Sequence, residues 1–229
     1  MPTGKKSPIL ASSTASAANL ITPDYWDEAC QYLSQRDRVM SRLIPLFGQA
    51  RLQSRGDPFT TLARAIVGQQ ISVKSAQAVW DRLMALFPTG SGLVEPAQML
   101  ICKYEDLRGV GLPGRKVDYL VDLALHFQEQ ALHPQQWDNM NDEAIVEELT
   151  DIRGIGRWTA EMFLIFYLMR PNILPLDDIG LIKGISVNYF SGESVSRAEA
   201  RELGEGWAPY RSVATWYLWS SLDPIPVEY

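Results

Sequence analysis

This 229-residue sequence has little of what several protein classes require. Two cysteines, Cys30 and Cys102, are too few for a disulfide framework, a zinc cluster or a four-cysteine iron–sulfur site. This cysteine usage suggests a reducing, cytoplasmic compartment. The two histidines, His126 and His133, have no metal-ligand spacing. The longest apolar run, residues 162–169, falls far short of the ~18 residues that a membrane span needs, so no membrane partner is expected.

An excess of basic residues is also missing. The chain has 21 Lys and Arg against 27 Asp and Glu, which gives a net charge of −6. A protein that coats nucleic acid through bulk charge would be basic, so any nucleic-acid contact here must be local. The apolar fraction of 46% is enough for a sizeable core, in one domain or in two small ones. Residues 1–22 are rich in Ser, Thr and Ala and too polar for a secretory signal, and we predict a disordered tail.

From residue 23 onward the apolar pattern is helical. After Ser72, a good N-cap, apolar residues recur on one helical face as far as Phe87, and the same spacing begins again near Arg115. Further helices are predicted at roughly 24–35, 38–48, 58–68, 142–149, 157–169, 179–189, 197–206 and 210–220. No segment alternates with a period of two, so no sheet is expected. The sequence therefore predicts an all-α protein whose helices are joined by Gly and Pro loops.

One turn has the pattern of a phosphate-binding motif. Gly154 and Gly156 lie between a helix that ends at Leu149 and one that begins at Arg157. Two such glycines allow a tight turn and leave no side chain over the next helix N-terminus, where free N–H groups and the helix dipole attract phosphate. The pattern is typical of a helix-hairpin-helix and predicts phosphate contacts from these residues: Arg153, Gly154, Ile155, Gly156 and Arg157.

A similar Gly-x-Gly turn occurs earlier, over residues 107–116. Its segment from Gly109 to Gly114 departs from the hairpin pattern. We interpret it mainly as a structural turn, with a phosphate contact from Arg115 or Lys116 as the alternative.

Three motifs in sequence order carry a family resemblance. AIVGQQIS at 65–72, IRGIGRWTA at 152–160 and LPLDDIGL at 174–181 together resemble the helix-hairpin-helix DNA glycosylases. Within these the chain is similar to the DNA-3-methyladenine glycosylase II branch, in its compact form, over about residues 24–221. The resemblance implies two helical lobes with an active cleft between them. We expect one lobe from residues 57–170, with the hairpin at about 142–169, and the other from residues 23–56 plus 171–229.

The resemblance implies that Asp178 is the catalytic residue. Such enzymes flip a damaged nucleotide out of the duplex and hydrolyse its N-glycosidic bond. Departure of the base builds positive charge on the sugar, which a carboxylate stabilises while it orients the attacking water. The structural alternative for Asp177 and Asp178 is an N-cap, and Asp177 is expected as a cap or as support for its neighbour.

The same resemblance suggests roles for further side chains. Trp158 occupies the position of the lysine that attacks the sugar in bifunctional relatives, and since Trp cannot form a Schiff base, strand cleavage is not expected. Trp158 and Trp219 are predicted base-pocket residues, because electron-rich rings attract a cationic base. Met162 is predicted to line the same pocket, at a position where larger relatives have an aromatic residue. Gln70 is predicted to insert into the gap left by the flipped base, with Ile71 as the alternative.

The sequence leaves two assignments open: the role of Arg211 and the presence of a cation at the hairpin. Arg211 could neutralise a buried acid near the pocket or form a surface ion pair. The chemistry requires no cofactor, but relatives suggest a monovalent cation, Na⁺ or K⁺, held by backbone carbonyls near Thr150, Ile152 and Ile155.

The resulting hypothesis is a monomeric, monofunctional glycosylase that removes alkylated purines from duplex DNA in base excision repair. Its substrate would be chiefly 3-methyladenine, with 7-methylguanine as a second candidate. Three alternatives remain: a glycosylase for uracil, mismatched or oxidised bases; a non-catalytic DNA-binding hairpin protein; and an all-α interaction protein unrelated to DNA.

Overall fold

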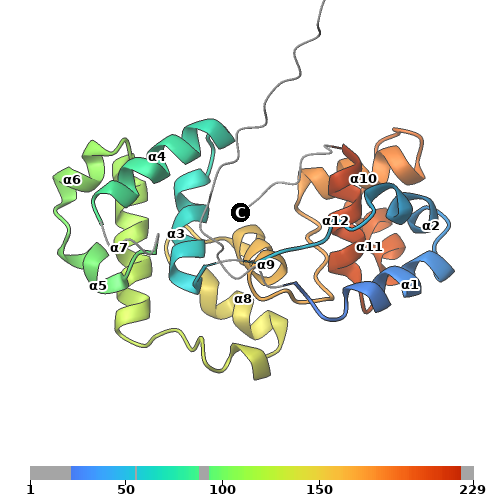
Figure 1. The fold of residues 1–229 in the computed structure, drawn as a ribbon, viewed down its shortest axis with the longest axis horizontal. Coiled ribbons are helices and arrows are strands. Elements are labelled where there is room, and N and C mark those ends of the chain that lie inside the picture. Colours follow the sequence, from blue (N-terminus) through green and yellow to red (C-terminus); the bar gives the residue numbers. More distant parts are fainter. Residues whose placement is uncertain (1–21, 55, 88–92, 223–229) are drawn as a thin grey trace, which may run out of the picture.

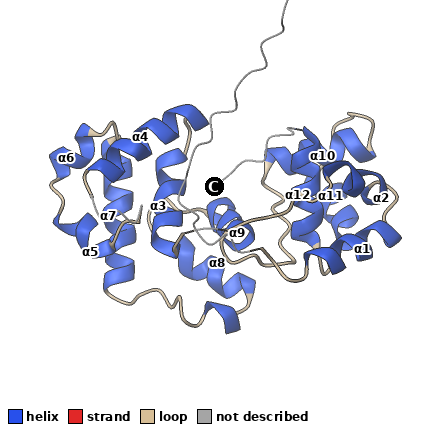
Figure 2. Cartoon of the chain, viewed as in Figure 1, coloured by secondary structure: helices blue, strands red, loops and turns tan. Residues whose placement is uncertain are grey.

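The computed structural model describes residues 22–54, 56–87 and 93–222, and within them every regular element is a helix (Figure 2). The all-α prediction is therefore confirmed. The predicted tail lies almost wholly outside the described residues. The elements are α1 (Trp26–Arg36), α2 (Met40–Leu43), the 3₁₀ helix η1 (Ile44–Phe47), α3 (Pro58–Gly68), α4 (Val73–Ala85), α5 (Pro96–Ile101), α6 (Tyr104–Gly109), α7 (Gly114–Gln128), the 3₁₀ helix η2 (Trp137–Asn139), α8 (Asp142–Thr150), α9 (Arg157–Phe166), α10 (Ile179–Tyr189), α11 (Arg197–Glu205) and α12 (Arg211–Leu222).

The differences from the predicted helices have local causes. The short helices α5 and α6 were not predicted, because six residues are too few to display a helical period. Helix α9 ends at Phe166 rather than near residue 169, and Met169 adopts a positive φ of 52° in the segment that follows. The predicted Ser72 cap is present, since its side chain accepts a hydrogen bond from the Ser75 N–H.

The helices form two groups (Figure 1). Helices α3 to α9 pack together in one group, with α7 against α3, α5 and α6, and α9 against α3 and α8. The second group joins the two ends of the described chain, because α12 packs on α1, α2 and α10. None of the helices in the described segments has the length and apolar character needed to cross a membrane.

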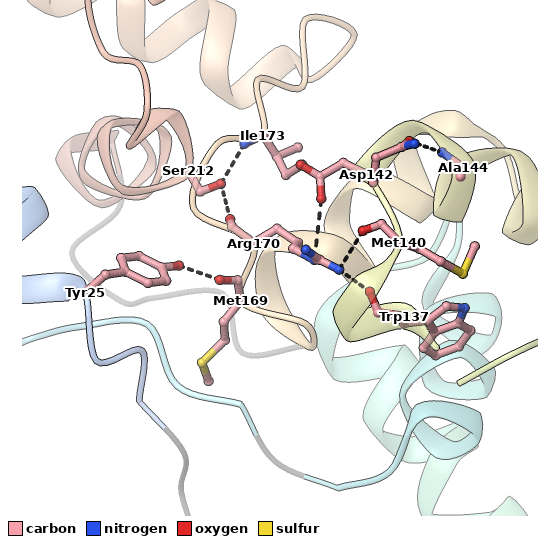
Figure 3. A network of polar contacts seen from close by, with 10 residues as sticks. Tyr25, Trp137, Met140, Asp142, Ala144, Met169, Arg170, Ile173 and Ser212 are labelled. Atoms are coloured by element: carbon pink, nitrogen blue, oxygen red, sulfur yellow. Dashed lines mark hydrogen bonds and ion pairs between the residues drawn. The ribbon is translucent and has the colours of Figure 1, made fainter. Parts of the chain in front are cut away.

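A polar network fixes the junction between the groups (Figure 3). The Arg170 guanidinium, just after α9, donates to the carbonyl oxygens of Trp137 and, at 3.2 Å, Met140. The Arg170 carbonyl accepts from the Ser212 hydroxyl of α12 at 2.6 Å, and the Tyr25 hydroxyl donates to the Met169 carbonyl at 2.6 Å. The crossing segment is thus bonded to both groups, which holds α10 and α9 in a defined relative position.

Candidate active site

Asp178 lies at the N-terminus of α10 and is that helix's N-cap. Its Oδ1 accepts from the Leu181 N–H at 2.6 Å, as a capping carboxylate does. The same oxygen accepts from Trp219 Nε1 of α12 at 2.7 Å, and Oδ2 accepts from Trp158 Nε1 of α9 at 2.9 Å. An ionised carboxylate is an acceptor only, so three N–H donors match its charged form.

The arrangement joins the two helical groups at one carboxylate. Trp158 comes from the hairpin side and Trp219 from the group formed by the chain ends, while Asp178 opens α10. The Trp219 ring also stacks on Phe166 of α9, with centroids 5.6 Å apart and planes 12° apart. The Phe166–Trp219 stack and the two indole hydrogen bonds connect α9, α10 and α12, and they set the orientation of the Asp178 carboxylate.

A cavity of about 520 Å³ lies between α3, α4 and α9. Its volume lies within the range of small-ligand pockets. Asp178 does not line it, and Trp158, which does, links the cavity to the carboxylate through its hydrogen bond to Oδ2. The predicted pocket residues Trp158 and Met162 line it, and so do the predicted inserting residues Gln70 and Ile71. Trp219 does not line this cavity, and its indole is engaged with Phe166 and Asp178 instead.

Sequence reasoning missed Phe166 as a wall of the cavity. Met162 stands where larger relatives were expected to have an aromatic residue, and the ring that contributes to this wall comes from one helical turn later. The i, i+4, i+8 spacing of Trp158, Met162 and Phe166 was a signal that could have identified it, because residues four apart share a helix face.

The hairpin folds as predicted, with α8 and α9 packed on each other across residues 151–156. Gly154 has a φ of +86°, which favours glycine, and a Cβ there would lie 2.2 Å from Tyr119 Cδ2. Gly156 is the N-cap of α9, and open space surrounds its Cα where a side chain would be. A helix N-terminus left uncovered in this way suits an anion.

Both hairpin arginines have carboxylate partners in this structure. The Arg153 N–H donates to Asp122 Oδ2 at 2.8 Å, and its Nε donates to Oδ1 at 3.0 Å. Arg157 is hydrogen-bonded to Glu143 and lies 3.5 Å from Glu161 Oε1. Their roles as phosphate ligands stay predictions. To bind DNA in this way, each arginine would have to exchange its carboxylate partner for a phosphate.

The structure corrects the role expected for Asp177 and places Arg211 elsewhere. Asp177 does not cap α10, because Asp178 itself occupies the cap; it is exposed and pairs with Arg197 at 2.8 Å. Arg211 Nε donates to the Gly204 carbonyl at 3.0 Å, and its side chain lines a second cavity of about 350 Å³ that also contains Glu161. Burial raises the pKa of the Glu161 carboxyl above its ordinary value.

The suggested cation at the hairpin stays a prediction. The Ile152 carbonyl accepts from the Ile155 N–H at 3.1 Å, which closes the turn and leaves that oxygen a second lone pair for a ligand. The carbonyls of Thr150 and Ile155 flank the same turn, so this backbone fits the oxygen-donor chemistry of a monovalent ion. Across the described ranges, no group of three or more His, Cys, Asp or Glu side chains is placed to hold a metal ion.

The described residues combine an all-helical fold, a helix-hairpin-helix, and an Asp at a helix N-terminus that is bonded to a tryptophan of an apolar cavity. These features define a class of proteins that process bases in DNA. The chain belongs to the HhH-GPD superfamily of base excision DNA repair proteins, whose family description matches residues 63–209.

Several relatives are named as 3-methyladenine glycosylases. The chain is 31% identical over 195 residues to DNA-3-methyladenine glycosylase 1 of Schizosaccharomyces pombe, covering 83% of this chain and 85% of that protein. A solved DNA-3-methyladenine glycosidase from Bacillus halodurans superposes with a TM-score of 0.78 at 33% identity, covering 92% of this chain and 95% of that one. The S. pombe 3-methyladenine DNA glycosylase in complex with abasic DNA gives 0.76 at 29% identity, covering 88% and 100%.

Proposed function

We propose that this chain is a monomeric DNA glycosylase that extrudes alkylated purines from duplex DNA and hydrolyses their N-glycosidic bond. The observation that carries the proposal is the Asp178 carboxylate, held by three N–H donors, one of which comes from Trp158 in the wall of a cavity that Met162 and Phe166 also line. The names of the relatives support 3-methyladenine as the main substrate. 7-methylguanine is a second candidate, because its nucleotide is also cationic.

The reaction follows from the charge on the substrate. A purine nucleotide methylated at N3 of adenine or N7 of guanine is cationic, so when the N-glycosidic bond breaks, the base takes the bonding electron pair and leaves neutral. The sugar becomes positively charged, and the Asp178 carboxylate stabilises that charge and orients a water for attack at the same carbon. The departing base needs little acid assistance, so a second catalytic carboxylate is not required.

The apolar cavity suits such a base. The indole of Trp158 is 36% exposed, so its ring face is accessible to a flipped nucleotide while its N–H is bonded to Asp178. An aromatic face attracts a cation, and this attraction is stronger where water is excluded. Trp158 therefore contributes both a base-binding surface and a hydrogen bond that orients the catalytic carboxylate.

The product should be an intact strand with an abasic site. Trp158 opens onto the cavity where a lysine of a bifunctional enzyme would stand, and an indole cannot attack the sugar as an amine does. Strand cleavage should appear only after treatment with alkali.

The test is base release from methylated duplex DNA by the wild type and by Asp178→Asn. Asn is as good an N-cap as Asp, so α10 should stay folded. Loss of the carboxylate should reduce the rate by about 10²- to 10³-fold, the usual cost of removing one electrostatic stabiliser of a transition state.

Other outcomes distinguish the alternatives. Release of uracil or oxidised bases, but not of methylpurines, would assign the chain to another lesion class. Duplex binding with no base release from any lesion would make it a DNA-binding module. Strand nicking by the purified wild type would contradict the monofunctional assignment.

A further inference from the structure

Lys116 is a charged side chain in an unusual place. It lies in the first turn of α7 and is only 4% exposed. Burial of an unpaired ammonium is costly, and here Nζ donates to the carbonyls of Val67 and Gln69, at 2.7 Å each. These carbonyls belong to the C-terminal end of α3, where unpaired acceptors and the negative end of the helix dipole favour a cation. Lys116 thus fixes the point at which the chain leaves α3.

The loop that follows adopts a strained conformation. Gln70 has a φ of +59°, a left-handed geometry that is unfavourable for a non-glycine residue and persists only where the surroundings impose it. Its Oε1 accepts from Arg115 Nη2 at 2.9 Å. The Gln69 Nε2 donates to the Gly154 carbonyl at 2.8 Å, which ties the loop to the hairpin.

The same helix supports the hairpin. Tyr119, three residues after Lys116, packs its ring against the Cα of Gly154. Asp122, three residues further, bonds both the backbone N–H and the side chain of Arg153. Residues three apart lie on neighbouring parts of one helix face, so a single face of α7 contacts both loops that border the cavity.

We propose that Lys116 is a positioning residue for Gln70, and that α7 sets the distance between the inserting loop and the phosphate-binding hairpin. The inference rests on the proposed function. It also assigns a role to the first Gly-x-Gly turn, which precedes α7. A phosphate contact is excluded for Lys116, because its ammonium is buried and bonded to the two α3 carbonyls.

The consequence concerns the extrusion step and not the chemistry. The Lys116 ammonium is bonded to the end of α3, and the Asp178 carboxylate is held by other residues, so a base already outside the stack should be hydrolysed at the normal rate. A stacked and paired base must first be displaced, and its gap filled, before it reaches the cavity. Loss of Lys116 should therefore matter most for a fully paired lesion.

The experiment compares two duplexes that carry 7-methylguanine at one position. In one the lesion is opposite cytosine, and in the other it is opposite a stable abasic analogue, which lowers the cost of extrusion. Lys116→Met should reduce single-turnover release from the paired duplex by about 10- to 100-fold, as expected when a contacting group is displaced by ~1 Å. Release from the unpaired duplex should fall much less.

Three further variants complete the test. Lys116→Arg keeps a donor cation and should recover most of the loss, while Lys103→Met, at an exposed lysine before α6, should behave as wild type. Lys116→Gln keeps an N–H donor and provides a milder test should the methionine variant fail to fold. Adding Gln70→Ala to Lys116→Met should cause no further loss, since both changes remove the same function.

Equal losses on the two duplexes, or no loss on the paired one, would overturn the proposal. Amide hydrogen exchange separates it from the proposed function. Faster exchange in residues 68–72 of Lys116→Met, relative to Lys103→Met, supports the anchoring role, and unchanged exchange overturns it. The exchange experiment tests the anchoring role even when the wild type releases no base. Absence of base release would reject the proposed function itself.

Discussion

Gly180 is expected to be essential for the geometry of the catalytic carboxylate although it has no side chain. It is the second residue of α10, two positions after the Asp178 cap. A Cβ at this position would lie 3.0 Å from Asp178 Oδ1 and 3.1 Å from Trp219 Nε1, the two atoms that form a 2.7 Å hydrogen bond. Since the Trp219 ring is stacked on Phe166, it cannot retreat freely. Gly180→Ala should therefore lengthen this bond by a few tenths of an ångström.

The effects on stability and activity should differ. Alanine is favoured over glycine in a helix by about 1 kcal/mol, which offsets much of the cost of the close contact, so the free energy of unfolding should change by no more than ~1 kcal/mol. A hydrogen bond to a charged group contributes about 1.5–3 kcal/mol. Each 1.4 kcal/mol is about a factor of ten in rate, so weakening this bond should slow base release by roughly 10-fold, and at most about 100-fold.

The assay is single-turnover release of 7-methylguanine, paired with urea unfolding of the same preparations. Gly109→Ala is the matched control, because Gly109 ends α6 with open space where its Cβ would be. That variant should keep the wild-type rate. A wild-type rate for Gly180→Ala would refute the reasoning, as would a rate loss that only follows a loss of folded protein.

Three further predictions follow from single contacts. Gly154→Ala should destabilise the protein by more than ~3 kcal/mol in urea unfolding, given its φ of +86° and a Cβ 2.2 Å from the Tyr119 ring. Adding Tyr119→Ala should recover the part of this stability loss that comes from the clash with the Tyr119 ring. Burial raises the pKa of Glu161, so the folded state binds its proton more tightly than the unfolded state, and stability should fall as pH rises above the ordinary glutamate range. Glu161→Gln should remove that fall in urea unfolding measured across this pH range. Trp158→Phe keeps a ring in the cavity but removes the donor to Asp178 Oδ2, and should slow base release about 10-fold with little change in DNA affinity.

Each of these predictions has an outcome that contradicts it. Equal destabilisation of the Gly154 single and double variants would show that the ring contact is unimportant. Parallel pH curves for wild type and Glu161→Gln would show that this carboxyl does not titrate abnormally. Reduced DNA affinity at an unchanged rate in Trp158→Phe would assign its role to the ring and not to the N–H group.

The sequence by itself determined the helical class and the hairpin. Apolar periodicity and caps such as Ser72 are local signals, read within one or two helical turns, and they placed most helices correctly. The Gly154 and Gly156 spacing identified the hairpin for the same reason, since a tight turn depends on the backbone freedom of its own residues. The family motifs indicated Asp178 as the residue to examine.

Only the tertiary structure decided how these residues act together. Trp158 lies 20 residues before Asp178 and Trp219 lies 41 residues after it, yet both indoles donate to its carboxylate. Lys116 reaches the end of α3 across 49 residues of sequence, and no local pattern distinguishes it from an exposed lysine. Such contacts arise when helices from separate parts of the chain pack together, so the positions and directions of their donors depend on the whole core and not on any short segment.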